Sequence, residues 1–145
     1  MFYGEYEHAI DRKGRIIIPA NFRKILQTNN IDTLFLTRGL DGCLFLFAES
    51  EWRLAEARFK QVSFTKAEGR KFNRVFFSGA SEVTLDRLGR TLIPKHLKEF
   101  AQINQDVVVV GVSNRIEIWA KDKWREFYET SRQGFEDVAE RVLLE

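Results

Sequence analysis

The order of hydrophobic and polar residues predicts four strands and one helix in the first half of the chain. Residues 3–10 alternate loosely between the two kinds of side chain, which is typical of a half-buried strand. Apolar residues after Pro19 recur at the helical spacing i, i+3, i+4, so a short amphipathic helix is expected there. The expected strands are 3–10, 16–18, 33–37 and 43–47. The first half therefore reads β-β-α-β-β.

The second half repeats this order of elements. Strands are expected at 82–85, 91–93, 107–112 and 116–119, and a helix is expected after Pro94. The apolar residues of this helix follow the same spacing as those after Pro19. Both halves are therefore expected to fold alike.

A stretch of nine residues is the clearest sign of this repeat. Asp11–Pro19 returns as Asp86–Pro94, 75 positions later (86 − 11 = 75), with Asp, Arg, Gly, Arg, Ile and Pro in the same places. The two copies also hold the only two prolines of the chain. Each copy predicts a polar turn that leads into a short strand, which ends at a proline able to begin a helix. Two related halves are therefore expected.

Helices are also expected between the two halves and after the second. Apolar residues at steps of three and four predict an amphipathic helix over 51–64. Thr65 with Glu68 predicts a capping box that begins a second helix, and Gly79 is placed to end it.

A long C-terminal helix is expected from Trp124 onward, loosened near Gly134. The aromatic residues of these helices are interpreted as packing faces. The expected organisation is a first unit at 5–50, a helical linker at 51–80, a second unit at 81–124 and a C-terminal helix at 125–145.

The composition limits the kinds of protein that this chain can be. Each half is about 50 residues long and would bury too little surface to fold alone, so it is expected to need a partner surface. Cys43 is the only cysteine, which excludes an intramolecular disulfide, and no zinc-binding spacing occurs, so no metal or cofactor is expected. The N-terminus lacks the pattern of a signal peptide, and the longest apolar run, 107–112, is far shorter than the about 20 residues of a membrane span. A soluble cytoplasmic protein is expected.

Positive charge gathers at the two repeated turns, although the whole chain carries a net charge of only +2. Residues 11–15 sum to +2 and residues 86–90 to +1. An Asp at the start of a turn can accept hydrogen bonds from later backbone amides, and a Gly supplies the positive φ that such a turn needs. The residues expected to hold the turns are Asp11, Gly14, Asp86 and Gly89. The turn does not require the basic side chains beside these residues.

The two Asp-x-x-Gly-Arg turns that run into Ile-Pro, with Gly42-Cys43-Leu44 and Ile116–Trp119 at matching ends, resemble the MraZ family. That family belongs to the SpoVT-AbrB class of bacterial DNA-binding proteins. The likeness extends from Tyr3 to about Trp124. It implies an α+β fold of two tandem AbrB-like swapped-hairpin β-barrel half-units, which form one pseudo-dimeric barrel flanked by helices.

The resemblance also implies a function. Members of the family are transcriptional regulators of the cell-division and cell-wall gene cluster that contains their own gene. They bind short direct repeats in double-stranded DNA upstream of that gene, as ring-shaped homo-oligomers. A protein associated with the nucleoid is therefore expected.

The functional signature of the family is an Asp and an Arg four residues apart, which falls here on Asp11 with Arg15 and on Asp86 with Arg90. The two arginines are expected to make the central contacts, because a guanidinium can bind O6 and N7 of guanine or clamp a phosphate. The cations expected to bind phosphates and to set the salt dependence are Arg12, Lys13 and Arg87. Leu88 stands where the first turn has Lys13, so the second turn is expected to bind DNA less strongly.

Other interpretations of the residues stay open. The turns could be salt-bridged structures that only stabilise a barrel. A scaffold that binds another protein, with little dependence on salt, is the alternative function. An enzyme has the least support, because His8 and His96 have no partnered nucleophile and no glycine-rich phosphate loop occurs. Catalytic residues and a small-molecule substrate are therefore not expected.

Overall fold

The computed structural model describes residues 1–144, and both halves follow the predicted order β-β-α-β-β. In the first half the elements are β1 (Phe2–Ala9), β2 (Arg15–Ile17), α1 (Ala20–Thr28), β3 (Leu34–Arg38) and β4 (Leu44–Ala48). In the second half they are β5 (Ser81–Val83), β6 (Arg90–Leu92), α4 (Lys95–Phe100), β7 (Asp106–Ser113) and β8 (Ile116–Ala120). The remaining helices are α2 (Glu49–Lys60), α3 (Ala67–Gly79), α5 (Lys121–Arg132) and α6 (Phe135–Leu143).

The two halves exchange strands within one antiparallel sheet of six strands, ordered β1-β7-β8-β4-β3-β5. At one edge β1 of the first half pairs with β7 of the second, and at the other edge β5 of the second half pairs with β3 of the first. The centre joins β4 to β8. The remaining strands, β2 and β6, pair with each other in a separate ribbon. The predicted α+β class is confirmed, and neither half forms its sheet alone.

One hydrophobic core lies between the sheet and the helices that follow the two prolines. Phe22 of α1 and Leu97 of α4 are fully buried in it, together with Ile18 and Ile118. Pro19 and Pro94 are the N-caps of α1 and α4, where a fixed φ suits the start of a helix. Both halves therefore contribute to the same core, as their short length requires.

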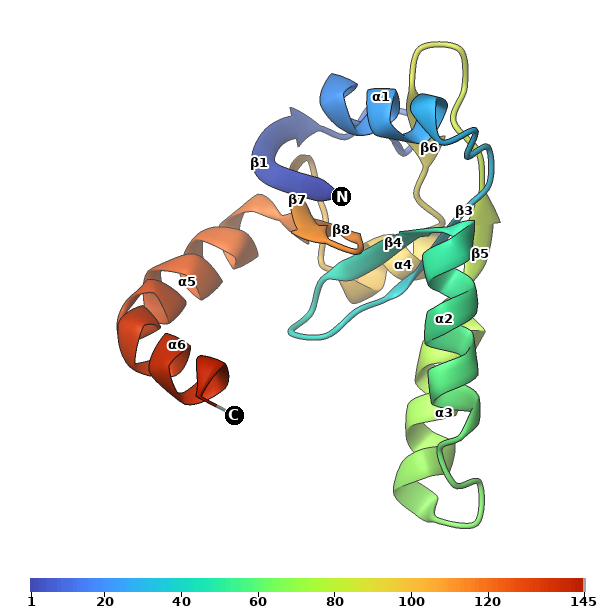
Figure 1. The fold of residues 1–145 in the computed structure, drawn as a ribbon. Coiled ribbons are helices and arrows are strands. Elements are labelled where there is room, and N and C mark those ends of the chain that lie inside the picture. The colour runs from blue at the N-terminus through green and yellow to red at the C-terminus, as the bar shows by residue number, and fades with distance from the viewer. Residues whose placement is uncertain (145) are drawn as a thin grey trace.

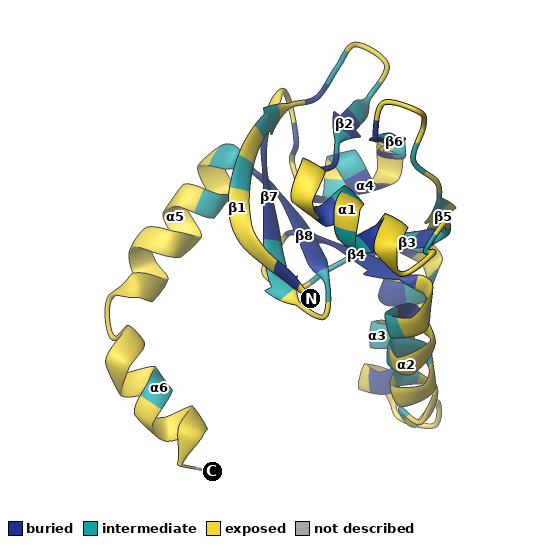
Figure 2. Ribbon diagram, turned by 45° about the horizontal axis from the view of Figure 1, so that its top comes forward, coloured by how far each residue is buried: buried dark blue, intermediate teal, exposed yellow. Residues whose placement is uncertain are grey.

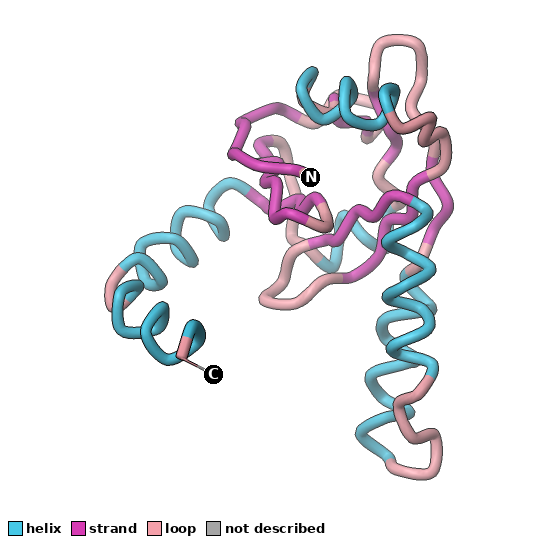
Figure 3. Tube along the Cα trace, viewed as in Figure 1, coloured by secondary structure: helices cyan, strands magenta, loops and turns pink. Residues whose placement is uncertain are grey.

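A second, aromatic core lies against α2 and α3. Trp52 stacks on Phe35 of β3, with ring centroids 5.1 Å apart, and on Phe76 of α3, at 5.7 Å. The helical hairpin of α2 and α3 projects from the sheet (Figure 1). Figure 3 shows the strands gathered at the centre, with this hairpin extending to one side and α5 and α6 to another. The interpretation of the central aromatic residues as packing faces is confirmed, although Phe64 at the tip of the hairpin and Phe135 on α6 are exposed.

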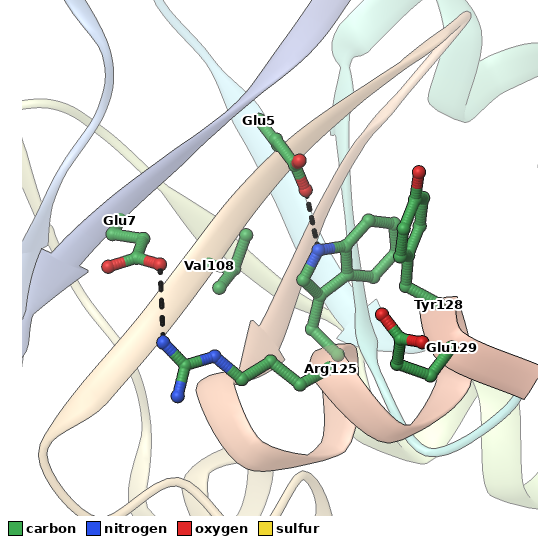
Figure 4. A pocket seen from close by; sticks show the side chains of 7 residues that line it. Glu5, Glu7, Val108, Arg125, Tyr128 and Glu129 are labelled. Atoms are coloured by element: carbon green, nitrogen blue, oxygen red, sulfur yellow. Dashed lines mark hydrogen bonds and ion pairs between the residues drawn. The ribbon is translucent and has the colours of Figure 1, made fainter.

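The sheet fixes α5 through its first two turns. Trp124 packs against Trp119 of β8 at 5.3 Å between ring centroids, and its indole N–H donates to the carboxylate of Glu5. Figure 4 shows Glu5 and Glu7 of β1 facing this helix. Lys121, at the start of the helix, makes an ion pair with Glu7 at 3.1 Å. The start of α5 is therefore held by contacts with β1 and β8.

Two sequence predictions about helix ends are wrong. Thr65 does not form a capping box with Glu68, because the N-cap of α3 is Lys66 and no side chain caps it; the Thr65 hydroxyl lies 2.8 Å from that of Ser63 instead. The C-terminal helix is two helices, because Gly134 adopts a left-handed φ of +77° and precedes a new helix. The prediction for 125–145 also includes Glu145, which lies outside the described residues. None of the helices in residues 1–144 has the length and apolar character of a membrane span.

Candidate nucleic-acid interface

The first repeated turn is held by the carboxylate of Asp11. Its Oδ1 accepts hydrogen bonds from the backbone N–H groups of Lys13 and Arg15, both at 2.9 Å. The N–H of Gly14 donates to the Asp11 carbonyl oxygen at 3.0 Å, and Gly14 has a φ of +79°. An Asp and a Gly are needed here because the short carboxylate reaches the amides and only glycine adopts this φ without strain.

The second turn has the same geometry. Oδ1 of Asp86 accepts from the N–H groups of Leu88 and Arg90, both at 2.9 Å. The N–H of Gly89 donates to the Asp86 carbonyl oxygen at 2.9 Å, and its φ is +80°. Two sequences that differ at the third position therefore form one kind of turn.

Each carboxylate also orients an arginine. Nε of Arg15 donates to Oδ2 of Asp11 at 2.7 Å, and Nε of Arg90 donates to Oδ2 of Asp86 at 2.8 Å. Among the described residues, the terminal nitrogens of both arginines make no hydrogen bond, and the two side chains are 26% and 31% exposed. The aspartate thus fixes each guanidinium by its inner nitrogen and leaves the outer fork available, which is the part that can bind a base edge or a phosphate.

The same contacts set the charge state of the two carboxyl groups. The backbone N–H of Arg15 is the main cause that lowers the pKa of Asp11, and the backbone N–H of Arg90 does the same for the pKa of Asp86. Both groups are therefore ionised at neutral pH, which keeps the two ion pairs formed.

The ribbon of β2 and β6 brings the turns together. Arg15 pairs with Leu92 and Ile17 pairs with Arg90, so the two arginines lie on neighbouring strands about 7 Å apart along the strand direction. Because alternate residues of a strand share a face, all four side chains lie on the outer face of the ribbon, while Ile16 is buried on the other. Figure 2 shows both turns projecting on the same side of the molecule, beyond β2 and β6.

The remaining predicted cations lie at the tips of the turns. Arg12 and Lys13 are exposed on the first turn and Arg87 on the second. Leu88, which stands where the first turn has Lys13, is 58% exposed. In the strand expected at 16–18, Ile16 and Ile18 are buried, whereas Ile17 faces outward between the two arginines and is half-buried.

Sequence reasoning missed Arg23. This half-buried residue of α1 reaches the second turn, where its Nη1 donates to the carbonyl oxygen of Leu88 at 3.4 Å. Its side chain passes so close to Gly89 that a Cβ there would overlap with Arg23 Cδ. No local pattern could have shown this contact, because 65 residues separate Arg23 from Leu88.

No cluster of His, Cys, Asp and Glu side chains within residues 1–144 is arranged to hold a metal ion. Cys43 is fully buried, and burial raises the pKa of its thiol above the ordinary value. Its side chain packs with Phe45 and Trp52 in the aromatic core. The thiol also donates a hydrogen bond to the carbonyl oxygen of Leu40 at 3.2 Å, so Cys43 fills space in the core with its polar group satisfied.

Comparison with known proteins places the repeat in a family. The sequence model of the family described as "MraZ protein, putative antitoxin-like" matches residues 1–75 and 76–145, two segments that divide the chain at the interval of the repeat. Two curated proteins, each named "Transcriptional regulator MraZ", are 44% identical to this chain over 143 residues, which is 99% of this chain and 97% of the relative. One comes from Natranaerobius thermophilus and the other from Syntrophomonas wolfei subsp. wolfei.

Proposed function

Because the chain belongs to the MraZ family, we propose that it is a DNA-binding transcriptional regulator whose two repeated turns contact the DNA. It is not an enzyme. The observation that carries the proposal is the pair of guanidinium groups, each oriented by an aspartate and each with its outer fork open on the same face of the ribbon. The family resemblance is confirmed. The proposals below on the DNA target and on the ring-shaped assembly follow from it.

The turns enter a groove of double-stranded DNA as a β-ribbon does. Arg15 and Arg90 bind base edges, because a planar fork suits O6 and N7 of guanine. Arg12, Lys13 and Arg87 at the exposed tips bind phosphates and fix the register. Asp11 and Asp86 hold the arginines in place before DNA arrives, which lowers the entropy lost on binding.

The fold supports this role through the exchange of strands between the halves. We propose that β1, β5 and the ribbon of β2 and β6 close with the rest of the sheet into a swapped-hairpin barrel, so that one chain resembles an AbrB-type dimer. In such a pseudo-dimer the two turns are related by an approximate two-fold axis. One subunit then presents two similar contacts to the DNA.

The target is a set of short direct repeats upstream of the protein's own gene, in the cluster for cell division and cell wall synthesis. One subunit offers few cations, so several subunits must bind together to reach high affinity. A ring-shaped homo-oligomer meets this need, because it presents many turns to repeated sites. The protein then resides in the cytoplasm, on the nucleoid.

The C-terminal helix α6 is a surface suited to such assembly. Its apolar residues Phe135, Val138 and Val142 are 64%, 47% and 61% exposed, and its three acids outnumber its one arginine. Helix α3 has the opposite charge, with Arg70, Lys71 and Arg74 against one glutamate. The tip of the α2–α3 hairpin also holds an apolar cleft of about 380 Å³, lined by Phe59, Val62 and Phe72 among others.

We propose that α6 of one subunit docks on the α2–α3 hairpin of the next. Contacts between α5 and the sheet hold α6 away from the hairpin of its own chain (Figure 1), so the contact joins two copies. A contact between two different surfaces repeats from copy to copy, and it closes into a ring when the rotation allows.

The test is a gel-shift titration of the purified protein against DNA from immediately upstream of its gene. Scrambled DNA of equal length is the control, and both are measured at two salt concentrations. We expect tight binding that depends on the repeats and weakens as salt rises. Equal and weak binding to both DNAs would refute specific recognition and direct attention to a protein partner.

A further inference from the structure

We propose that Arg23 of α1 is a DNA-contacting residue that supplies the phosphate contact which Leu88 cannot make at the second turn. This inference rests on the proposed DNA-binding function. The first turn carries Arg12, Lys13 and Arg15, whereas the second carries only Arg87 and Arg90. The cation of Arg23 brings the second turn to the same number.

The geometry places this cation on the second turn. Nη1 of Arg23 donates to the carbonyl oxygen of Leu88, the residue that takes the place of Lys13. The aliphatic part of the side chain lies against Gly89, whose missing Cβ leaves the necessary room. The guanidinium is therefore held at the turn by packing and by one hydrogen bond.

The first turn has no equivalent brace. The residue 75 positions after Arg23 is Lys98 on α4. A Cβ on Gly14 would meet only Leu92 and Ile93 within 4 Å, at ordinary contact distances, so no side chain of α4 lies against the first turn as Arg23 lies against the second. The first turn, which contains Lys13, therefore has no such cation from α4. The second turn, which contains Leu88, has Arg23 from α1.

Arg23 has no counter-charge among the described residues. Its Nε is buried without a hydrogen-bond partner, and no carboxylate of residues 1–144 lies within ion-pair distance of its guanidinium. A half-buried cation without a counter-charge loses solvation and gains no ion pair in return. A phosphate of DNA lying along the second turn would supply the missing charge.

The experiment measures how the affinity for upstream DNA depends on salt for Arg23→Gln, which removes the charge and keeps a polar side chain with the first two methylene groups of arginine. Lys24→Gln is the matched control, because it removes the same charge from an exposed neighbour on α1. We expect Arg23→Gln to make the negative slope of log K against log salt shallower, by about 0.9 for each second turn that is engaged. Lys24→Gln should leave the slope unchanged.

A second substitution tests whether Arg23 contacts a phosphate or only supports the structure of the turn. Leu88→Lys places the missing cation on the turn itself, so Arg23→Gln/Leu88→Lys should recover both the affinity and the slope of the wild type. Equal slopes for Arg23→Gln and Lys24→Gln, or failure of Leu88→Lys to restore the slope in a folded protein, would overturn the proposal. A wild-type protein without specific binding would instead refute the proposed function.

Discussion

The backbone N–H of Ile18 donates to the carbonyl oxygen of Gly89 at 2.9 Å, so the segment that leaves the first turn is bonded to the second turn. The reverse contact is made by Ile93, whose N–H donates to the carbonyl oxygen of Gly14 at 2.9 Å. The segment that follows each turn is therefore hydrogen-bonded to the other turn. A substitution that distorts one turn should therefore also alter the geometry of the other turn.

The two turn glycines should differ in their tolerance of alanine. Gly14 and Gly89 have almost the same φ, so each substitution carries a backbone cost of about 1 to 2 kcal/mol. At Gly89 the new methyl group would also displace Arg23, whereas at Gly14 it meets only ordinary contacts. We expect Gly89→Ala to lower the free energy of unfolding more than Gly14→Ala, as measured by urea denaturation.

The extra cost at Gly89 should depend on Arg23. Shortening that side chain removes the obstacle, so Gly89→Ala should cost about as much as Gly14→Ala when both are made in an Arg23→Ala background. Equal stability of the two glycine variants in the wild-type background would show that Arg23 does not lie against the turn.

Arg15→Ala should weaken binding to upstream DNA by about 1 to 3 kcal/mol and leave the fold intact. The side chain is partly exposed and makes only the ion pair with Asp11, so its loss creates no cavity in the core. Gel-shift titration gives the affinity, and thermal unfolding checks the fold. Unchanged affinity in a folded variant contradicts the assignment of Arg15 as a central contact.

Arg90→Ala tests the balance between the turns. From the sequence alone its effect is expected to be smaller than that of Arg15→Ala, because Leu88 replaces a lysine. With Arg23 counted, each turn has three cations, and we expect similar effects in the wild-type background. An effect of Arg90→Ala much smaller than that of Arg15→Ala would favour the expectation from sequence over the role of Arg23.

The geometry of each turn could be predicted because its contacts are local. Asp11 accepts hydrogen bonds from backbone amides two and four residues later, and the positive φ of the same turn requires Gly14. The nine residues of the repeat are therefore enough to predict the shape of the turn. The strands were likewise visible, since their periodicity depends on burial of one face. The break of the C-terminal helix was underestimated, because the sequence shows a glycine at 134 but not the φ of +77° that it adopts.

Long-range contacts could not be predicted in the same way. The pairing of Tyr3 with Val112 and the approach of Arg23 to Leu88 join positions that the repeat treats as unrelated. The repeat also suggests that the two turns have the same surroundings, whereas in the structure only the second turn is contacted by an arginine of a helix, Arg23. An internal repeat predicts what the halves share, and their differences depend on packing.

Stability should fall at low pH partly through Asp11 and Asp86. Their pKa values are lower in the folded protein than the ordinary 3.8, because backbone amides donate to the charged carboxylates. The unfolded chain therefore binds more protons in the interval between the two values, so the stabilisation is nearly complete above about pH 5 and is lost as the pH falls through the folded values. Urea denaturation at several pH values below about 5 should show a smaller loss of stability for Asp11→Asn/Asp86→Asn than for the wild type. An identical pH profile would contradict this contribution.

The proposed contact between α6 and α3 predicts how charge reversal affects assembly. Glu136→Lys/Glu140→Lys makes α6 basic, and Lys71→Glu/Arg74→Glu makes α3 acidic. In either variant alone, like charges face each other at every contact, so both should dissociate toward the 17.0 kDa monomer in light scattering at low salt. Glu126→Lys/Glu129→Lys on α5 is a control with the same change in charge at a site outside the proposed contact.

Mixing the two reversed variants should restore assembly. The basic α6 of the first variant then faces the acidic α3 of the second, and the unchanged α6 of the second faces the unchanged α3 of the first, so opposite charges meet at every contact when the variants alternate. Alternation closes a ring only if the number of subunits is even, because an odd ring places two copies of one variant side by side. A mixture that reaches the mass of the wild-type assembly would therefore support both the contact and an even ring. A mixture that stays monomeric would show that the two helices do not face each other across the interface.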